Sequence, residues 1–470
     1  MHTVEKIGGT SMTQFGAVMR NIIVGDRRGP ELYNRIFVVS AYGGITDLLL
    51  EHKKSGKPGV YALYAALDPS WEAALSGVAT QMCELNATFG DLGLDVDAAD
   101  SFVRQRLAEI RSCLLDLRRL RSYGHFQLTD QLGAVRELLS AVGEAHSAWN
   151  AVEILNANGI SATYVDLTGW KDTDTLPMDE KIASALAELD FSTTIPVVTG
   201  YTKCSEGIMS TFDRGYSEIT FARVAVLTNA AEGVIHKEFH LSTGDPKLVG
   251  ADRVRVIGRT NYDVADQLAD IGMEAIHPKA SKGMERAGIP IRVKNTFEPN
   301  HPGTVIDHTF KSDSVRVDMV TGHKQMVGVE VWDSSMVGQA GYDYRLLAHF
   351  ARHGISYVAK NTNANTITHF FRAGERNLDQ CVADIREAYP HAKVRVTEVS
   401  IVCAIGSNMD VPGFLARAAS ALANEGINIL AFSQCLRQVN MQFIVSAEEF
   451  ETSIIALHRA LVEREPDYAA

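Results

Sequence analysis

The chain has 470 residues, of which 46% are hydrophobic and 22% are charged, a balance typical of folded globular proteins. Its formal net charge of −12 excludes a general nucleic-acid or membrane-surface binder, because such proteins present an overall basic surface. An anionic substrate needs only a local basic pocket and stays compatible with this charge. The length leaves room for roughly two to four domains.

The six cysteines are scattered and form no C-x-x-C pair, so we interpret them as reduced core residues rather than a disulfide framework or a zinc site. No signal-peptide pattern precedes the first predicted strand, and no apolar run reaches the roughly 18 residues of a membrane helix. The run His236-Lys237-Glu238-Phe239-His240 departs from H-E-x-x-H at its second residue, and we predict no protein metal site. These features predict a cytoplasmic protein without membrane attachment.

The stretch Lys6-Ile7-Gly8-Gly9-Thr10-Ser11 lies between a β-prone run and a helical pattern that extends from Met12 to Val24. It predicts a strand, a glycine turn and a helix with Thr10 or Ser11 at the N-cap. Adjacent glycines let the backbone approach a ligand, and the first helical N–H groups with Lys6 form an anion site. An ordinary turn with a surface lysine remains the alternative, and neither a Walker loop nor G-x-G-x-x-G is present.

Strand and helix patterns alternate over the first 300 residues. An apolar strand over 36–39 ends in the turn Gly43-Gly44, and residues 59–122 and 134–158 read as helices. Further strands are predicted at 162–166, 194–200, 224–229 and 289–293. This order predicts an α/β fold with an open, mostly parallel sheet sandwiched by helices, and ligands at the carboxyl ends of its strands. By pattern alone, Glu144 is expected on a helix surface.

Residues 210–220 place an arginine, a glycine, a hydroxyl and a carboxylate before a helix, which suits an anion-binding loop. A capped helix start with an exposed arginine is the rival interpretation. Residues 299–314 are rich in Pro, His, Gly and Asp and read as a linker, and 244–247 read as a turn.

The carboxyl-terminal part repeats one order of elements. Strands at 326–331, 355–358 and 366–371 accompany helices at 339–353 and 378–389, and strands at 399–405, 427–432 and 441–445 accompany helices at 411–425 and 449–462. Two βαββα units of this kind are typical of ferredoxin-like modules. We place a first domain at 1–307, a linker at 308–322 and the two modules at 323–396 and 397–470.

Taken together, the motifs resemble those of aspartate kinases, members of the amino acid kinase family, in the right order over nearly the whole chain. The matching stretches are 6–11 (their K-F-G-G-T-S), 38–46 (V-S-A-x-x-G-x-T), 143–144 (G-E), 214–218 (R-G-G-S-D), 228–229 (T-D), 245–247 (D-P-R) and 277–278 (the H-P of L-H-P). The paired carboxyl-terminal units resemble their ACT regulatory modules.

Several positions depart from the family pattern, and they resemble the divergent aspartate kinases found with ectoine biosynthesis. The departures are Ile7 for Phe, Tyr216 for Gly, Glu218 for Asp, Asn229 for Asp and a longer spacing between 228 and 245. Glu274 stands where these enzymes have a lysine associated with the ATP phosphates. We therefore expect Lys237 or Lys247 to supply that charge from the longer loop.

The resemblance implies transfer of the ATP γ-phosphate to the side-chain carboxylate of L-aspartate, with ATP and Mg²⁺ as cofactors. The implied catalytic residues are Lys6, Gly8, Gly9 and Ser11. The implied aspartate-binding residues are Ser40, Thr46, Glu144, Arg214, Gly215, Ser217 and Glu218. The implied nucleotide-binding residues are Lys6, Gly9, Thr228, Asn229, Lys237, Asp245 and Lys247.

The ACT modules imply feedback by a small amino acid, threonine or lysine, and pairing into a homodimer or larger homo-oligomer. Two alternatives stay open. The chain could be another amino acid kinase, acting on glutamate, N-acetylglutamate or carbamate, or an amino-acid sensor with weakened kinase activity. Glu274 and Asn229 are the residues that keep the sensor interpretation open.

Overall fold

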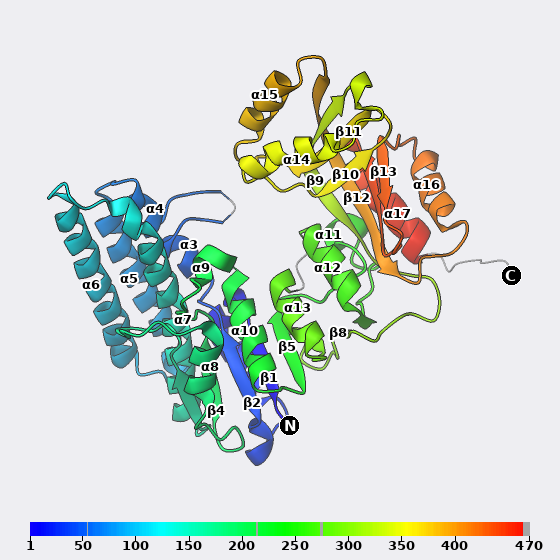
Figure 1. Ribbon diagram of the computed structural model, residues 1–470. Helices are drawn as coiled ribbons and strands as arrows, with labels where there is room; N and C mark the ends of the chain where they lie inside the picture. Colours follow the sequence, from blue (N-terminus) through cyan, green and yellow to red (C-terminus); the bar gives the residue numbers. More distant parts are fainter. Residues whose placement is uncertain (54, 213–214, 273–275, 464–470) are drawn as a thin grey trace. The chain divides into compact units, whose positions relative to one another are not determined.

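The computed structural model describes the chain except residues 54, 213–214, 273–275 and 464–470 (Figure 1). Two compact units result. The first comprises Met1–His240 and Ile276–His308, and the second comprises Leu241–Ala275 and Thr309–Ala470. Among the described residues, no helix is long and apolar enough to cross a membrane.

A mostly parallel sheet forms the centre of the first unit, with the strand order β3-β4-β2-β1-β5-β7-β8. β1 pairs in parallel with both β2 and β5, and β8 runs antiparallel to its neighbour β7. β2 is buried along its whole length, as expected for an apolar strand covered on both faces. The α/β fold with a mostly parallel sheet is thus confirmed. The strands are β1 (Thr3–Ile7), β2 (Arg35–Val39), β3 (Ala162–Val165), β4 (Ile195–Thr199), β5 (Glu232–Lys237), β7 (Ile291–Asn295) and β8 (Thr304–Ile306).

Helices cover this sheet, and α10 packs directly on β1, β2 and β5 (Figure 1). α7 packs against β3 and β4, and the long helices α5 and α6 lie side by side beyond it. The helices are α1 (Gly9–Thr13), α2 (Phe15–Val18), the π-helical turn η1 (Met19–Val24), α3 (Ile45–Leu49), α4 (Val60–Ala65), α5 (Trp71–Ala87), α6 (Val96–Arg121), α7 (Leu132–Ala157), α8 (Met178–Leu186), α9 (Ile208–Phe212), α10 (Tyr216–Leu227) and α13 (Pro278–Arg286).

Two local predictions for this unit are wrong. Residues 224–229 were expected to form a strand, but 224–227 complete α10 and the next strand is β5. A short apolar run cannot be assigned by periodicity when a helix is buried on several sides, as α10 is. The N-cap of α1 is Gly8 rather than Thr10 or Ser11, because the helix begins immediately after the strand.

The second unit is built on one six-stranded sheet with the order β10-β11-β9-β12-β14-β13. The long strands β9 and β12 pair antiparallel at its centre, and each half of the sheet carries its own apolar core. The strands of this sheet are β9 (Arg316–Trp332), β10 (Ala359–Thr362), β11 (Thr366–Arg372), β12 (Lys393–Ser407), β13 (Ala431–Gln434) and β14 (Asn440–Val445). The short strand β6 (Arg259–Thr260) is not part of it. The helices are α11 (Pro246–Val249), α12 (Tyr262–Asp270), α14 (Tyr342–Arg352), α15 (Leu378–Ala388), α16 (Phe414–Asn424) and α17 (Phe450–His458).

Some boundaries differ from those expected. The strand expected at 355–358 lies at 359–362, the turn at 244–247 contains the start of α11, and the linker segment 299–314 contains β8. β9 begins at Arg316, inside the predicted linker 308–322, and 241–275 groups with the second unit. The division at 1–307, 323–396 and 397–470 stays a prediction.

Candidate active site

The carboxyl ends of four parallel strands lie next to one another in the first unit. Ile7 of β1 is level with Val39 of β2 and His236 of β5, and Val39 is level with Thr199 of β4. The residues that follow these strands therefore share one edge of the sheet, the edge at which open α/β folds bind ligands.

Lys6 forms a buried ion pair with Glu218 at the start of α10. The Lys6 Nζ lies 3.4 Å from the Glu218 Oε1, and Lys6 is only 8% exposed. Burial raises the pKa of Glu218, but the charges of Lys6 and Lys237 outweigh it and the net pKa is lowered. The second carboxylate oxygen accepts the His277 backbone N–H at 2.5 Å. An ionised Glu218 thus holds the Lys6 ammonium in place.

Glu144 has the opposite protonation state. It lies in the middle of α7, is 2% exposed rather than on the helix surface as expected, and accepts a hydrogen bond of 3.2 Å from the Tyr216 hydroxyl. Burial raises its pKa to about 8, and the hydrogen bonds and the Lys6 charge only partly offset this. At neutral pH the carboxyl group is therefore mostly uncharged in the empty site, and a bound cation would ionise it.

Two predicted hydroxyl groups meet beside Glu144. The Ser40 Oγ, directly after β2, donates to the Ser217 Oγ at 3.1 Å. A Cβ at Gly200, directly after β4, would lie 2.7 Å from the Ser217 Cβ and 3.3 Å from the Glu144 Cγ. The absence of a side chain at Gly200 lets α7 and α10 converge on this point.

The glycine turn after β1 packs against the turn after β2. A Cβ at Gly9 would lie 2.5 Å from the Ala41 carbonyl oxygen, and the Gly43 N–H donates to the Gly9 carbonyl at 3.1 Å. Ser11 is fully buried and contacts Glu238 at 3.3 Å and Thr296 at 3.0 Å through its hydroxyl. Through these hydrogen bonds Ser11, which lies in α1, links this helix to the residues that follow β5 and β7.

Other expected aspartate contacts lie around this group. Thr46 is in α3, directly after the turn that contains Gly44, and Gly215 is the N-cap residue of α10. Arg214 lies outside the described residues, as does Glu274.

Thr228 and Asn229 do not lie at the carboxyl ends of the strands. α10 runs back along the sheet, and the Thr228 hydroxyl lies 2.8 Å from the His2 Nε2, next to the start of β1. Their expected contacts with a nucleotide rest on the resemblance of 228–229 to the family's T-D and stay a prediction. Lys237, the last residue of β5, is at the correct edge.

Asp245 and Lys247 belong to the second unit. The Asp245 side chain caps α11 by accepting the Lys247 backbone N–H at 2.9 Å. Their expected contacts with a nucleotide stay a prediction.

Three residues that contact the predicted site residues were not assigned to the site. Tyr216 and His277 lie inside matched motifs, and Glu238 lies outside them. Tyr216 could have been found as the bulky departure inside the 214–218 motif. Glu238 follows β5, so a correct assignment of that strand would have pointed to it.

Comparisons with known proteins agree with this geometry. Residues 1–295, more than half of the chain, match the amino acid kinase family. The chain belongs to the amino acid kinase family. Residues 402–461 match an ACT domain. A curated relative of this amino acid kinase, aspartate kinase Ask_Ect of Stutzerimonas stutzeri (strain A1501), is 50% identical over 467 residues, which cover 99% of this chain and 98% of the relative.

Solved structures show the same fold. The aspartate kinase of Clostridium acetobutylicum has a TM-score of 0.75 to this amino acid kinase at 19% identity, covering 98% of this chain and all of that one. E. coli aspartokinase III in complex with aspartate and ADP has a TM-score of 0.73 at 21% identity, with 98% and 100% coverage. The predicted kinase fold with a carboxyl-terminal ACT domain is confirmed.

The described residues of this amino acid kinase contain no group of three or more His, Cys, Asp or Glu side chains placed to hold a metal ion. Mg²⁺ usually binds through substrate phosphates with one or two protein carboxylates and several waters. Glu238, directly after β5, is a carboxylate at this edge of the sheet that fits this requirement.

Proposed function

We propose that this amino acid kinase is an aspartate kinase, which converts ATP and L-aspartate into ADP and 4-phospho-L-aspartate. The full-length relative at 50% identity, itself named an aspartate kinase, carries the proposal. The buried groups Lys6, Glu218 and Glu144 provide the charges that this reaction needs.

The reaction brings two anions together. The aspartate side-chain carboxylate has a reference pKa of about 3.9, so it is ionised at neutral pH and needs no general base. The barrier comes from charge repulsion and alignment, which a fixed cation reduces. Lys6 acts on the transferring phosphoryl group, and Glu218, whose Oε1 lies 3.4 Å from the Lys6 Nζ, fixes the position of the ammonium group.

Backbone donors are fewer than the glycine motifs suggest. The Gly8 N–H donates to the His236 carbonyl and the Gly43 N–H to the Gly9 carbonyl, so both are already engaged. The Gly9 N–H, at the first position of α1, has no intrahelical acceptor by geometry and is our candidate donor.

Aspartate binds beside the converging α7 and α10. Its α-ammonium group ionises Glu144, and the paired hydroxyls of Ser40 and Ser217 accept or donate to its oxygens. Arg214 and Thr46 complete the set proposed from the motifs, with Arg214 clamping a carboxylate in bidentate geometry.

ATP binds on the β5 side of Lys6. Lys237 contributes positive charge there, since its charge lowers the pKa of Glu218. Mg²⁺ on the ATP phosphates would supply further neutralisation of the transferring group. Lys237 is therefore our choice for the charge that the family lysine provides at the position of Glu274.

The second unit would give the enzyme its regulation. We propose that a small amino acid, threonine or lysine, binds to the ACT modules and that the enzyme acts as a homodimer or larger homo-oligomer. A lysine- and aspartate-bound T-state is described for E. coli aspartokinase III, which has this fold. The relative named Ask_Ect supports placement with the ectoine-associated aspartate kinases.

One assay distinguishes the candidate functions. Purified protein is incubated with Mg-ATP and single carboxylic amino acids, and hydroxylamine traps the acyl phosphate. Hydroxamate formation from aspartate alone supports the proposal. Formation from glutamate or N-acetylglutamate instead identifies another amino acid kinase, and no product from any acid identifies a sensor.

A further inference from the structure

A second polar cavity lies in the first unit, on the face of β1 opposite to Lys6. Neighbouring residues of a strand point to opposite faces, so Glu5 faces this cavity and Lys6 does not. The cavity has a volume of about 520 Å³ and takes its lining from β1, β2, β5, β7 and the segment after η1. Its lining includes His236 near the carboxyl end of β5, but the cavity lies on the face of the sheet opposite to Lys6 and the proposed kinase site.

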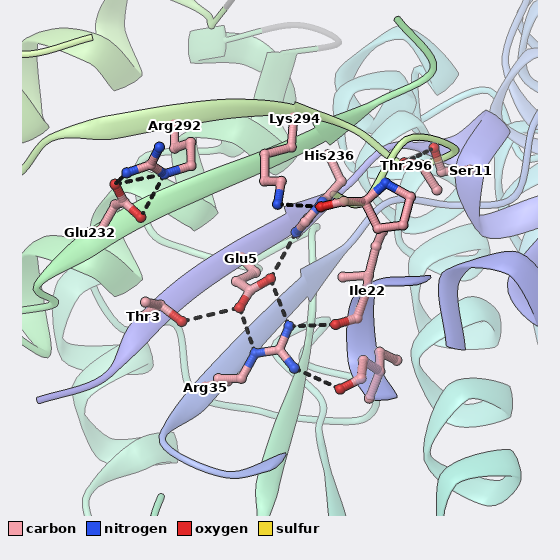
Figure 2. A network of polar contacts seen from close by, with 12 residues as sticks. Thr3, Glu5, Ser11, Ile22, Arg35, Glu232, His236, Arg292, Lys294 and Thr296 are labelled. Atoms are coloured by element: carbon pink, nitrogen blue, oxygen red, sulfur yellow. Dashed lines mark hydrogen bonds and ion pairs between the residues drawn. The ribbon is translucent and has the colours of Figure 1, made fainter. Parts of the chain in front are cut away.

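A buried ion pair forms the floor of this cavity (Figure 2). The Glu5 carboxylate accepts two hydrogen bonds from Arg35, at 2.6 and 3.0 Å, and lies 2.7 Å from the His236 Nε2. Arg35 also donates to the Ile22 and Ile23 carbonyls at 2.8 Å each. Glu5 is thus hydrogen-bonded within the protein. Its charge raises the pKa of Arg27 and Lys294, but by less than the nearest arginine lowers it.

The same holds for a second carboxylate. Glu232 accepts from Arg292, which lies 2.8 Å away at closest approach, and Figure 2 shows the two side chains facing each other on β5 and β7. The Glu31 carboxylate accepts the Arg28 backbone N–H. Glu5 and Glu232 are therefore paired with arginines, whereas the hydrogen-bond partner of Glu31 is a neutral backbone N–H.

Two cations of the lining have only carbonyl groups as hydrogen-bond partners among the described residues. The Lys294 Nζ donates to the Pro299 carbonyl at 2.9 Å, and the Arg27 Nη1 donates to the Ile22 carbonyl at 3.0 Å. Burial lowers the pKa of both, and neighbouring positive charges lower it further: Arg35 for Arg27, and Arg292 for Lys294. Both side chains retain N–H groups for a further acceptor.

We propose that this cavity binds a small anion with more than one negative charge, either a phosphate ester or a di- or tricarboxylate, held between Arg27 and Lys294. The crowding of cations in a chain of net charge −12 costs free energy, and a bound oxyanion would relieve it. The volume accommodates a small metabolite, and two of the three lining carboxylates, Glu5 and Glu232, are already paired with arginines.

Calorimetric titration of the full chain with pyrophosphate and, separately, with citrate tests this proposal. Wild-type protein should bind at least one probe, and Arg27→Gln with Lys294→Gln should weaken that binding by at least about tenfold. The matched control, Arg28→Gln with Lys282→Gln, removes the same charge from exposed residues outside the lining and should stay within about twofold.

The two probes also identify the chemistry. Binding of pyrophosphate alone indicates a phosphate ester, and binding of citrate alone indicates a polycarboxylate. Arg27→Lys keeps the charge and should retain more of the affinity than Arg27→Gln, which separates a charge effect from misfolding. Failure of the wild type to bind either probe, or unchanged affinity in the double Gln variant, overturns the proposal. Neither result bears on the kinase assay, which uses a different site.

Discussion

Replacing Glu144 with Gln removes the ionisable group of the proposed aspartate pocket but keeps the size and shape of the side chain. The pKa of Glu144 lies at about 8 rather than 4.5 because the carboxyl group is buried. That difference means that burial shifts the free energy of ionisation by about 5 kcal/mol toward the protonated form when no ligand is bound. An α-ammonium group can pair with Glu144 only after the proton leaves. Aspartate binding should therefore release about 0.9 of a proton per site at pH 7.

Isothermal calorimetry in buffers of different ionisation enthalpy measures that release directly. The apparent affinity of the wild type for aspartate should tighten by nearly tenfold per pH unit from about pH 6 to 7 and level off above pH 8. Glu144→Gln should bind more than about tenfold more weakly, with no proton release in this range. The control Glu153→Gln changes a partly exposed carboxylate on the same helix and should behave like the wild type. Equal proton release by the wild type and Glu144→Gln would refute the role of Glu144.

The same pKa sets the direction of a stability change. A carboxyl group with a folded-state pKa above its unfolded value binds more protons when folded, so stability falls as pH rises from about 4.5 to 8. The melting temperature of the wild type should therefore decline relative to that of Glu144→Gln over this range.

Lys6→Met should lower turnover by at least about a hundredfold in the hydroxamate assay, because it removes the cation that we propose acts on the transferring phosphoryl group. Undiminished turnover would contradict the mechanism. Lys237→Ala should raise the KM for ATP sharply and spare that for aspartate, and an unchanged ATP constant would exclude Lys237 as the replacement cation. Arg214→Lys should raise the KM for aspartate at least about tenfold, since lysine cannot form the bidentate pair; wild-type kinetics would remove Arg214 from the site.

Much of the first unit could be predicted from its pattern. β1, β2 and β4 are short β-prone strands followed by glycine turns, and this combination has few alternative structures. The same logic failed at 224–229, where β-branched residues lie inside a helix buried on several sides. Because 224–229 reads as a strand, β5 at Glu232–Lys237 is not predicted, and Glu238, which follows it, is missed.

The chemistry of the site was only partly readable. Lys6 and Glu144 were identified by the motifs, but their states depend on contacts between distant segments. Glu218 reaches Lys6 across 212 positions of the sequence, and Tyr216 reaches Glu144 across 72. Neither burial nor the resulting pKa values can be deduced from spacing, since they depend on how α7 and α10 converge on Gly200.

The central pair of strands in the second unit has a mechanical consequence. β9 and β12 hydrogen-bond to each other over most of their lengths, and each also carries the outer strands of one half. Separating the two halves would require the hydrogen bonds between β9 and β12 to be broken. A ligand that changes the twist of one half should therefore also change the backbone geometry of the other half, because β9 and β12 connect them.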